Sequence, residues 1–112
     1  MFRILTPLLF LWACQPDGPP EVPPTVDCDE VQPEEYEDLT IWTSCTECHA
    51  SDLTGAYRQG APEGVDFDTY EASAALAEDA AIEVYIGNMP FTGTVTEAEK
   101  QALYAWAMCG TP

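Results

Sequence analysis

The stretch Cys45-Thr46-Glu47-Cys48-His49 is a single C-x-x-C-H motif. Two thiols three positions apart on a helical turn can both reach the vinyl groups of one haem, and the next side chain then lies beneath the iron as a ligand. A thioredoxin-like redox pair needs a βαβ context, and no strand-like run surrounds this motif. A zinc site needs a second pair of ligands at metal spacing, but Cys28 and Cys109 are isolated and His49 is the only histidine. The motif therefore predicts covalent haem attachment.

The composition is strongly acidic. The chain has 112 residues, enough for one domain with appendages, and its 20 acidic residues face three basic ones, Arg3, Arg58 and Lys100. This balance excludes nucleic acid as a partner, because phosphate binding needs clustered Lys and Arg. Two interpretations of the acidity stay open: solubility, or electrostatic steering toward a basic partner.

Residues 1–13 have the pattern of a secretory signal peptide: one positive charge, an apolar run from Ile4 to Trp12, and the small residue Ala13. The run is shorter than the roughly 20 apolar residues of a membrane span. Leu11-Trp12-Ala13-Cys14 resembles the lipobox of bacterial lipoproteins, which predicts that Cys14 is lipid-modified and becomes the N-terminus. The alternative is an ordinary secretory peptide that leaves Cys14 as a spare thiol.

Residues 14–26 contain five prolines and almost no large apolar side chain. This composition predicts a semi-rigid, polyproline-like tether that holds the following domain clear of a membrane. The predicted location is therefore the periplasmic side of a bacterial membrane. The outer membrane is favoured because Gln15 stands where some bacteria use Asp to retain lipoproteins at the inner membrane.

Residues 27–112 are predicted to form one all-α domain. We find no convincing strand and no internal repeat. A loop rich in Gly and Pro is expected over 50–65. The expected helices run over about 33–44, 68–76 with Asp68 and Glu71 as a capping box, 79–87, and 96–108 with Thr96 and Glu99 as a capping box.

This order of elements, with a C-x-x-C-H, a Gly-Pro loop, a Met-Pro step and a capped terminal helix, resembles class I c-type cytochromes from about Pro33 to Gly110. Four stretches look like small cytochrome c lipoproteins of myxobacteria and their relatives: Arg58–Pro62, Val65–Tyr70, Met89-Pro90 and Trp106–Gly110. The resemblance implies a small helical fold wrapped around one covalent haem c.

The resemblance also implies roles for individual residues. Cys45 and Cys48 would form the thioether bonds, and His49 would be the proximal iron ligand. Met89 matches the methionine that supplies the sixth ligand. Pro62 matches the proline whose carbonyl accepts a hydrogen bond from the other ring nitrogen of His49, a contact that fixes the orientation of the ring.

Four further residues have competing interpretations. The Met-Pro step holds Met89 extended and favours a ligand role, whereas Met108 on the terminal helix is interpreted as packing. Trp106 would pack on the first helix. Arg58 would pair with a haem propionate, or else form an exposed ion pair with one of the many acids.

Cys28 and Cys109 are the cysteines that remain after lipid and haem take three of the five. Because two cysteines are left over in an oxidising compartment, we predict a disulfide between them.

Iron ligated by His and Met has no open position for a substrate, so these residues predict a one-electron carrier and not an enzyme. Two alternatives stay open. One is a haem-based sensor, in which Met89 dissociates to admit a small ligand. The other is a subunit that donates electrons to a larger oxidoreductase.

Overall fold

The computed structural model describes residues 25–90 and 94–112, and within these ranges it contains helices and no strand. The all-α prediction is therefore confirmed for this part of the chain. The predicted signal peptide, Cys14 and nearly all of the tether lie outside the described residues. The helical segments are η1 (Tyr36–Asp38), α1 (Trp42–Cys45), η2 (Gly55–Arg58), α2 (Tyr70–Ala75), α3 (Ala77–Tyr85) and α4 (Glu97–Met108).

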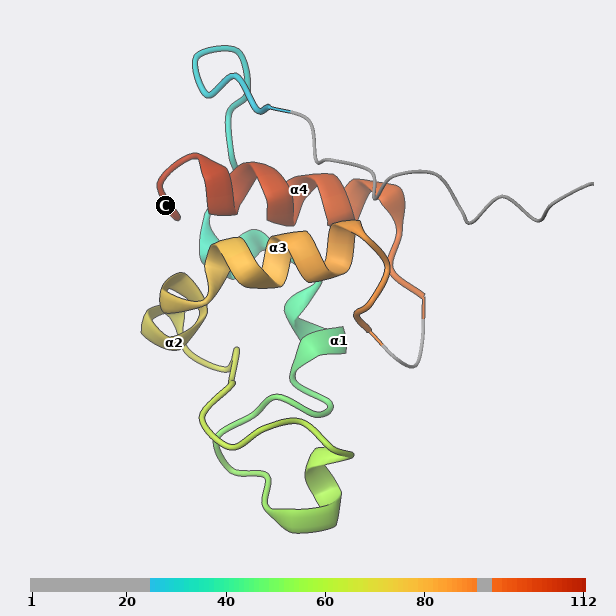
Figure 1. Ribbon diagram of the computed structural model, residues 1–112. Helices are drawn as coiled ribbons and strands as arrows, with labels where there is room; N and C mark the ends of the chain where they lie inside the picture. Colours follow the sequence, from blue (N-terminus) through green and yellow to red (C-terminus); the bar gives the residue numbers. More distant parts are fainter. Residues whose placement is uncertain (1–24, 91–93) are drawn as a thin grey trace, which may run out of the picture.

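Helices α3 and α4 lie side by side and run in opposite directions (Figure 1). Leu103 and Trp106 on the inner face of α4 have no solvent exposure. The ring of Trp106 meets that of Trp42 on α1 edge to face, with centroids 5.3 Å apart. Aromatic pairs in this geometry add to the stabilisation from burial. Trp106 therefore packs against the first helix, as predicted.

The C-terminus is tied back to the start of the domain. The carbonyl of Pro112 accepts hydrogen bonds from Trp106 Nε1 at 2.8 Å and from the Tyr36 backbone N–H at 3.1 Å. A disulfide joins Cys28 to Cys109, with Cα atoms 5.5 Å apart. These contacts close the domain around the buried face of α4.

The single helix predicted over 33–44 is wrong. The structure has the short turn η1, then Leu39 in an extended conformation with ψ of 113°, then α1. The Tyr36 carbonyl accepts from Trp42 Nε1 at 2.9 Å, an acceptor that a continuous helix would use for its own backbone. The break allows Leu39, Ile41 and Trp42 all to be buried, although they do not share one face of a helix.

The other helices agree more closely with the sequence. Thr96 and Glu99 form the predicted capping box at the start of α4. Helix α2 is capped by Thr69, whose side chain accepts from the Ala72 N–H at 3.2 Å, and not by Asp68 as predicted. Asp68 accepts instead from the Ser51 hydroxyl, and this hydrogen bond lowers the pKa of the carboxyl group. The loop is thereby fixed to the residues that precede α2.

The Cys28–Cys109 disulfide should be a major source of stability. It closes a loop with a sequence separation of 81 residues. Loop-closure entropy gives a contribution of up to about 4–5 kcal/mol for a loop of this size. The double variant Cys28→Ser/Cys109→Ser should lower the free energy of unfolding toward that amount in guanidinium titrations. An unchanged unfolding midpoint would contradict this expectation.

Candidate functional site

A largely apolar cavity of about 420 Å³ lies between α1, the loop over 50–65, α3 and α4. Its size falls within the ~300–1,000 Å³ typical of ligand and cofactor sites. Five residues singled out from the sequence line it: Cys45, Cys48, His49, Pro62 and Met89. Residues from the motif and from the Met-Pro step, 40 positions later, thus share one cavity.

Cys45 is the last residue of α1, and Cys48 lies in the turn that follows it. The backbone N–H groups of Cys48 and His49 both donate to the Cys45 carbonyl, at 3.3 and 2.9 Å, so the motif continues the helix as a turn. Cys45 and Cys48 are free thiols. Burial, and secondarily the negative charge of Glu99, raises the pKa of the Cys45 thiol to about 12. A thiol–disulfide redox site requires the opposite, a lowered pKa that yields a thiolate nucleophile.

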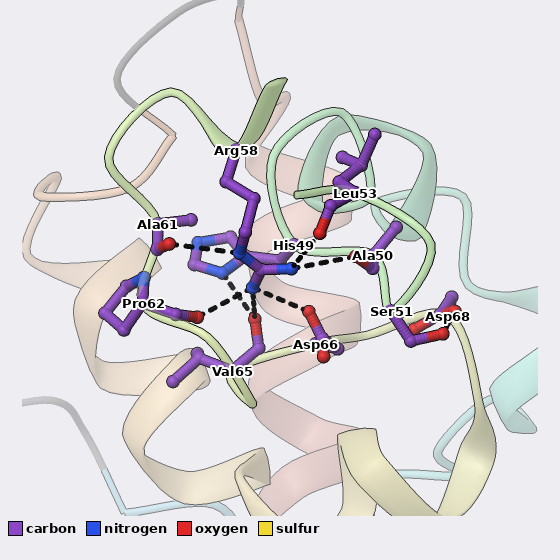
Figure 2. Close-up of polar contacts among 10 residues, drawn as sticks. All are labelled: His49, Ala50, Ser51, Leu53, Arg58, Ala61, Pro62, Val65, Asp66 and Asp68. Carbon is purple, nitrogen blue, oxygen red and sulfur yellow. Dashed lines mark hydrogen bonds and ion pairs between the residues drawn. The ribbon is translucent and has the colours of Figure 1, made fainter. Parts of the chain in front are cut away.

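The ring of His49 is held in one orientation. Its Nδ1 lies 2.7 Å from the Val65 carbonyl oxygen (Figure 2). A carbonyl can only accept, so Nδ1 carries the proton and Nε2 keeps its lone pair for a metal ion. The Phe67 N–H donates to the His49 carbonyl at 2.9 Å, and the Phe67 ring meets the imidazole edge to face. The imidazole is therefore presented as a preoriented ligand.

The expected partner of His49 is corrected by the structure. The Pro62 carbonyl, predicted to accept from the imidazole, accepts instead from Arg58 Nη2 at 2.6 Å. It also accepts from the Val65 N–H at 3.2 Å, which closes a turn in which Gly64 has a φ of 83°. This turn brings the Val65 carbonyl, three residues further along, to His49. Pro62 still lines the cavity.

One of the two interpretations of Arg58 from the sequence, the exposed ion pair, is wrong. The residue is only 2% exposed, so it does not form a surface ion pair. It is not among the residues that line the cavity, and its pairing with a haem propionate stays a prediction. Its guanidinium forms an ion pair with Asp66 at 2.8 Å and donates to backbone carbonyls of the surrounding loop (Figure 2).

Met89 is positioned by the end of α3. The helix stops at Gly87, which has a φ of 86°, a conformation that suits glycine. The backbone N–H groups of Asn88 and Met89 then donate to the Glu83 carbonyl at 3.0 and 3.2 Å. Met89 lines the cavity, whereas Met108 packs against the hydrophobic core and does not line it. Met89 also packs against that core, so lining the cavity is what separates the two methionines, and the ligand role of Met89 stays a prediction.

Three residues of the site were not identified from the sequence. Val65 supplies the carbonyl for His49, Phe67 packs its ring on the imidazole, and Asp66 forms an ion pair with Arg58. Their clustering in one short segment just before α2 is the signal that could have pointed to them. Which carbonyl in that segment meets the imidazole depends on the turn at Gly64.

Comparison with protein-family models, with curated proteins and with solved structures finds no match. Over residues 25–90 and 94–112, no helix is long and apolar enough to cross a membrane. The same residues contain no group of three or more His, Cys, Asp or Glu side chains that could hold a metal ion. Among the residues that line the cavity, the nitrogen and sulfur donors are His49, Cys45, Cys48 and Met89, and two carboxylates, Asp79 and Glu83, also line it.

Proposed function

We propose that the chain is a one-electron carrier that holds a single haem c in the cavity, attached through Cys45 and Cys48, with His49 and Met89 as the axial ligands of the iron. The observation that carries the proposal is the His49–Val65 hydrogen bond inside a cavity that two free thiols also line. An imidazole whose Nε2 is free to bind and a C-x-x-C pair beside it are the protein groups that such a haem requires.

The walls of the cavity fit a flat apolar ring. Leu76, Ala80 and Val84 come from the α2–α3 region, Ile41 and Leu103 come from the other side of the domain, and all five line it. These side chains would exclude water from the iron and its ligands. A dry, fixed environment limits the reorganisation that accompanies a change of charge.

The pair of ligands favours electron transfer over catalysis. Haem supplies the exchange of one electron between Fe(III) and Fe(II), and a methionine sulfur favours the reduced state. With His49 and Met89 both bound, no position would remain for a substrate. In this proposal the only histidine uses its Nδ1 proton for Val65 and its Nε2 lone pair for the iron, so neither nitrogen would be left to act as an acid or base.

The N-terminal segment suggests where the carrier works. We propose that Cys14 is lipidated after removal of residues 1–13 and that residues 14–26 tether the domain on the periplasmic side of a bacterial membrane. Multiple acyl chains hold a protein firmly, whereas one chain binds reversibly. The alternative, a subunit that donates electrons to a larger oxidoreductase, is compatible with the same anchor.

The redox partner is proposed to be basic at its docking surface. With residues 1–13 removed, 20 acids face two cations, so the net charge is −18. Asp79 and Glu83 line the cavity, and Glu47 is exposed within the C-x-x-C-H motif. A basic partner that approached the cavity would be attracted by these carboxylates.

Covalent haem attachment is the most direct test of the proposal. Expressed with a haem-ligation system, the protein should retain its haem through acid-acetone extraction and denaturing electrophoresis. Cys45→Ser/Cys48→Ser should lose it, while Cys28→Ser/Cys109→Ser should keep it. Release of haem from the wild type, or stoichiometric zinc in its place, would refute the proposal.

Met89→Ala should remove the sixth ligand. We expect loss of the weak sulfur-to-iron charge-transfer band of the oxidised protein, a lower reduction potential, and binding of CO to the reduced protein. Met108→Leu is the matched control, because Met108 packs against the core outside the cavity. If Met108→Leu lost the band and Met89→Ala kept it, the ligand assignment would be wrong. Binding of CO by the wild type would favour the sensor function.

Steering by the acidic surface predicts opposite salt effects for oxidants of opposite charge. Oxidation by a tripositive cobalt complex should slow as salt rises, whereas oxidation by ferricyanide should accelerate, because screening acts over about 8–10 Å. Asp79→Asn, beside the cavity, should slow the cationic oxidant more than Glu37→Gln, an exposed acid that does not line it. If the oxidation rates did not depend on salt for either oxidant, steering would be contradicted, and the acidic surface would serve solubility only.

A further inference from the structure

Arg58 is a buried cation with an unusually complete set of partners. It is 2% exposed, and each of its three side-chain nitrogens has an acceptor. The acceptors are the carbonyls of Ala50, Leu53, Ala61, Pro62 and Val65 and the carboxylate of Asp66. Such a site compensates for the burial of a charge that would otherwise be costly.

One of these acceptors is shared with the proposed iron ligand. The Val65 carbonyl lies 2.7 Å from His49 Nδ1 and 3.3 Å from Arg58 Nη2. A carbonyl oxygen has two lone pairs, so it can accept from both. Arg58 also donates to Ala50, the residue that follows His49. The guanidinium therefore holds both the carbonyl that orients the imidazole and the backbone beside that imidazole.

The same contact has an electrostatic consequence. A guanidinium is always protonated, and here it donates to the oxygen to which His49 also donates. A positive charge at this oxygen opposes the transfer of negative charge onto the imidazole through its N–H. It also stabilises an iron that carries one positive charge fewer. Asp66, at 2.8 Å from the same nitrogen, opposes this field.

We infer that Arg58 is a positioning residue for His49. Arg58 fixes the imidazole through the Val65 carbonyl and raises the reduction potential of the iron. This inference rests on the proposed haem site. It assigns to the Arg58–Asp66 pair a role that a purely structural anchor of the loop would not have.

The chain offers a matched control for the test. Lys100 and Glu97 form the other ion pair of the described residues, at 3.4 Å on α4, and neither lines the cavity. Arg58→Gln and Lys100→Gln therefore remove the same formal charge, as do Asp66→Asn and Glu97→Gln. Arg58→Lys keeps the charge but cannot reproduce the planar fork of donors.

The experiment measures the reduction potential of the haem-loaded variants and the exchange rate of the His49 Nδ1 proton by NMR. Arg58→Gln should lower the equilibrium constant for reduction about ten-fold. For a one-electron couple this lowers the reduction potential by about 59 mV. Asp66→Asn should raise the potential. Both Arg58→Gln and Arg58→Lys should accelerate proton exchange. The variants of Lys100 and Glu97 should show much smaller shifts and unchanged exchange.

Arg58→Gln and Lys100→Gln with equal shifts and unchanged exchange would overturn the inference and leave the haem site standing. A wild type without covalent haem would instead refute the proposed function. If Arg58→Gln and Arg58→Lys yielded no holoprotein, Asp66→Asn would decide. In that case, the inference would be overturned if Asp66→Asn raised the reduction potential no more than Glu97→Gln does.

Discussion

The 2.7 Å hydrogen bond between His49 Nδ1 and the Val65 carbonyl joins the segment that follows α1 to the segment that precedes α2. A second hydrogen bond, from the Phe67 N–H to the His49 carbonyl, also joins these two segments. Together they close one wall of the cavity and set the tautomer of the only histidine. The proposed chemistry depends on this pair of bonds, because Nε2 can bind a metal ion only while Nδ1 keeps the proton.

The aromatic core makes that arrangement rigid. The ring of Phe67 lies against His49 on one side and stacks on Trp42 on the other, with centroids 5.3 and 5.8 Å apart. Trp42 in turn meets Trp106, which has no exposure and is anchored to the carbonyl of Pro112. A side chain locked by packing and hydrogen bonds is a better ligand than one left free, because its conformational entropy is lost on folding and not when the metal binds. The terminal helix thus supports His49 indirectly, through Trp42 and Phe67.

The sequence predicts the parts of this molecule that local chemistry determines. The capping box of Thr96 and Glu99, the end of α3 at Gly87 and the pairing of Cys28 with Cys109 all agree with the structure. The break between η1 and α1 was missed because Trp42 Nε1 competes for the Tyr36 carbonyl, a contact that helical periodicity does not reveal. The partner of His49 was missed because the turn at Gly64 decides which carbonyl faces the ring. Arg58 was misjudged because its burial depends on six acceptors that only the folded loop assembles.

The central claim is that His49 and Met89 bind one iron in the shared cavity. X-ray absorption at the iron edge of the oxidised wild-type protein tests it most directly, because nitrogen and sulfur neighbours scatter differently. The expected result is five nitrogen neighbours, four from the haem and one from His49, and a single sulfur from Met89. Four sulfur neighbours, or six neighbours without sulfur, would contradict the claim.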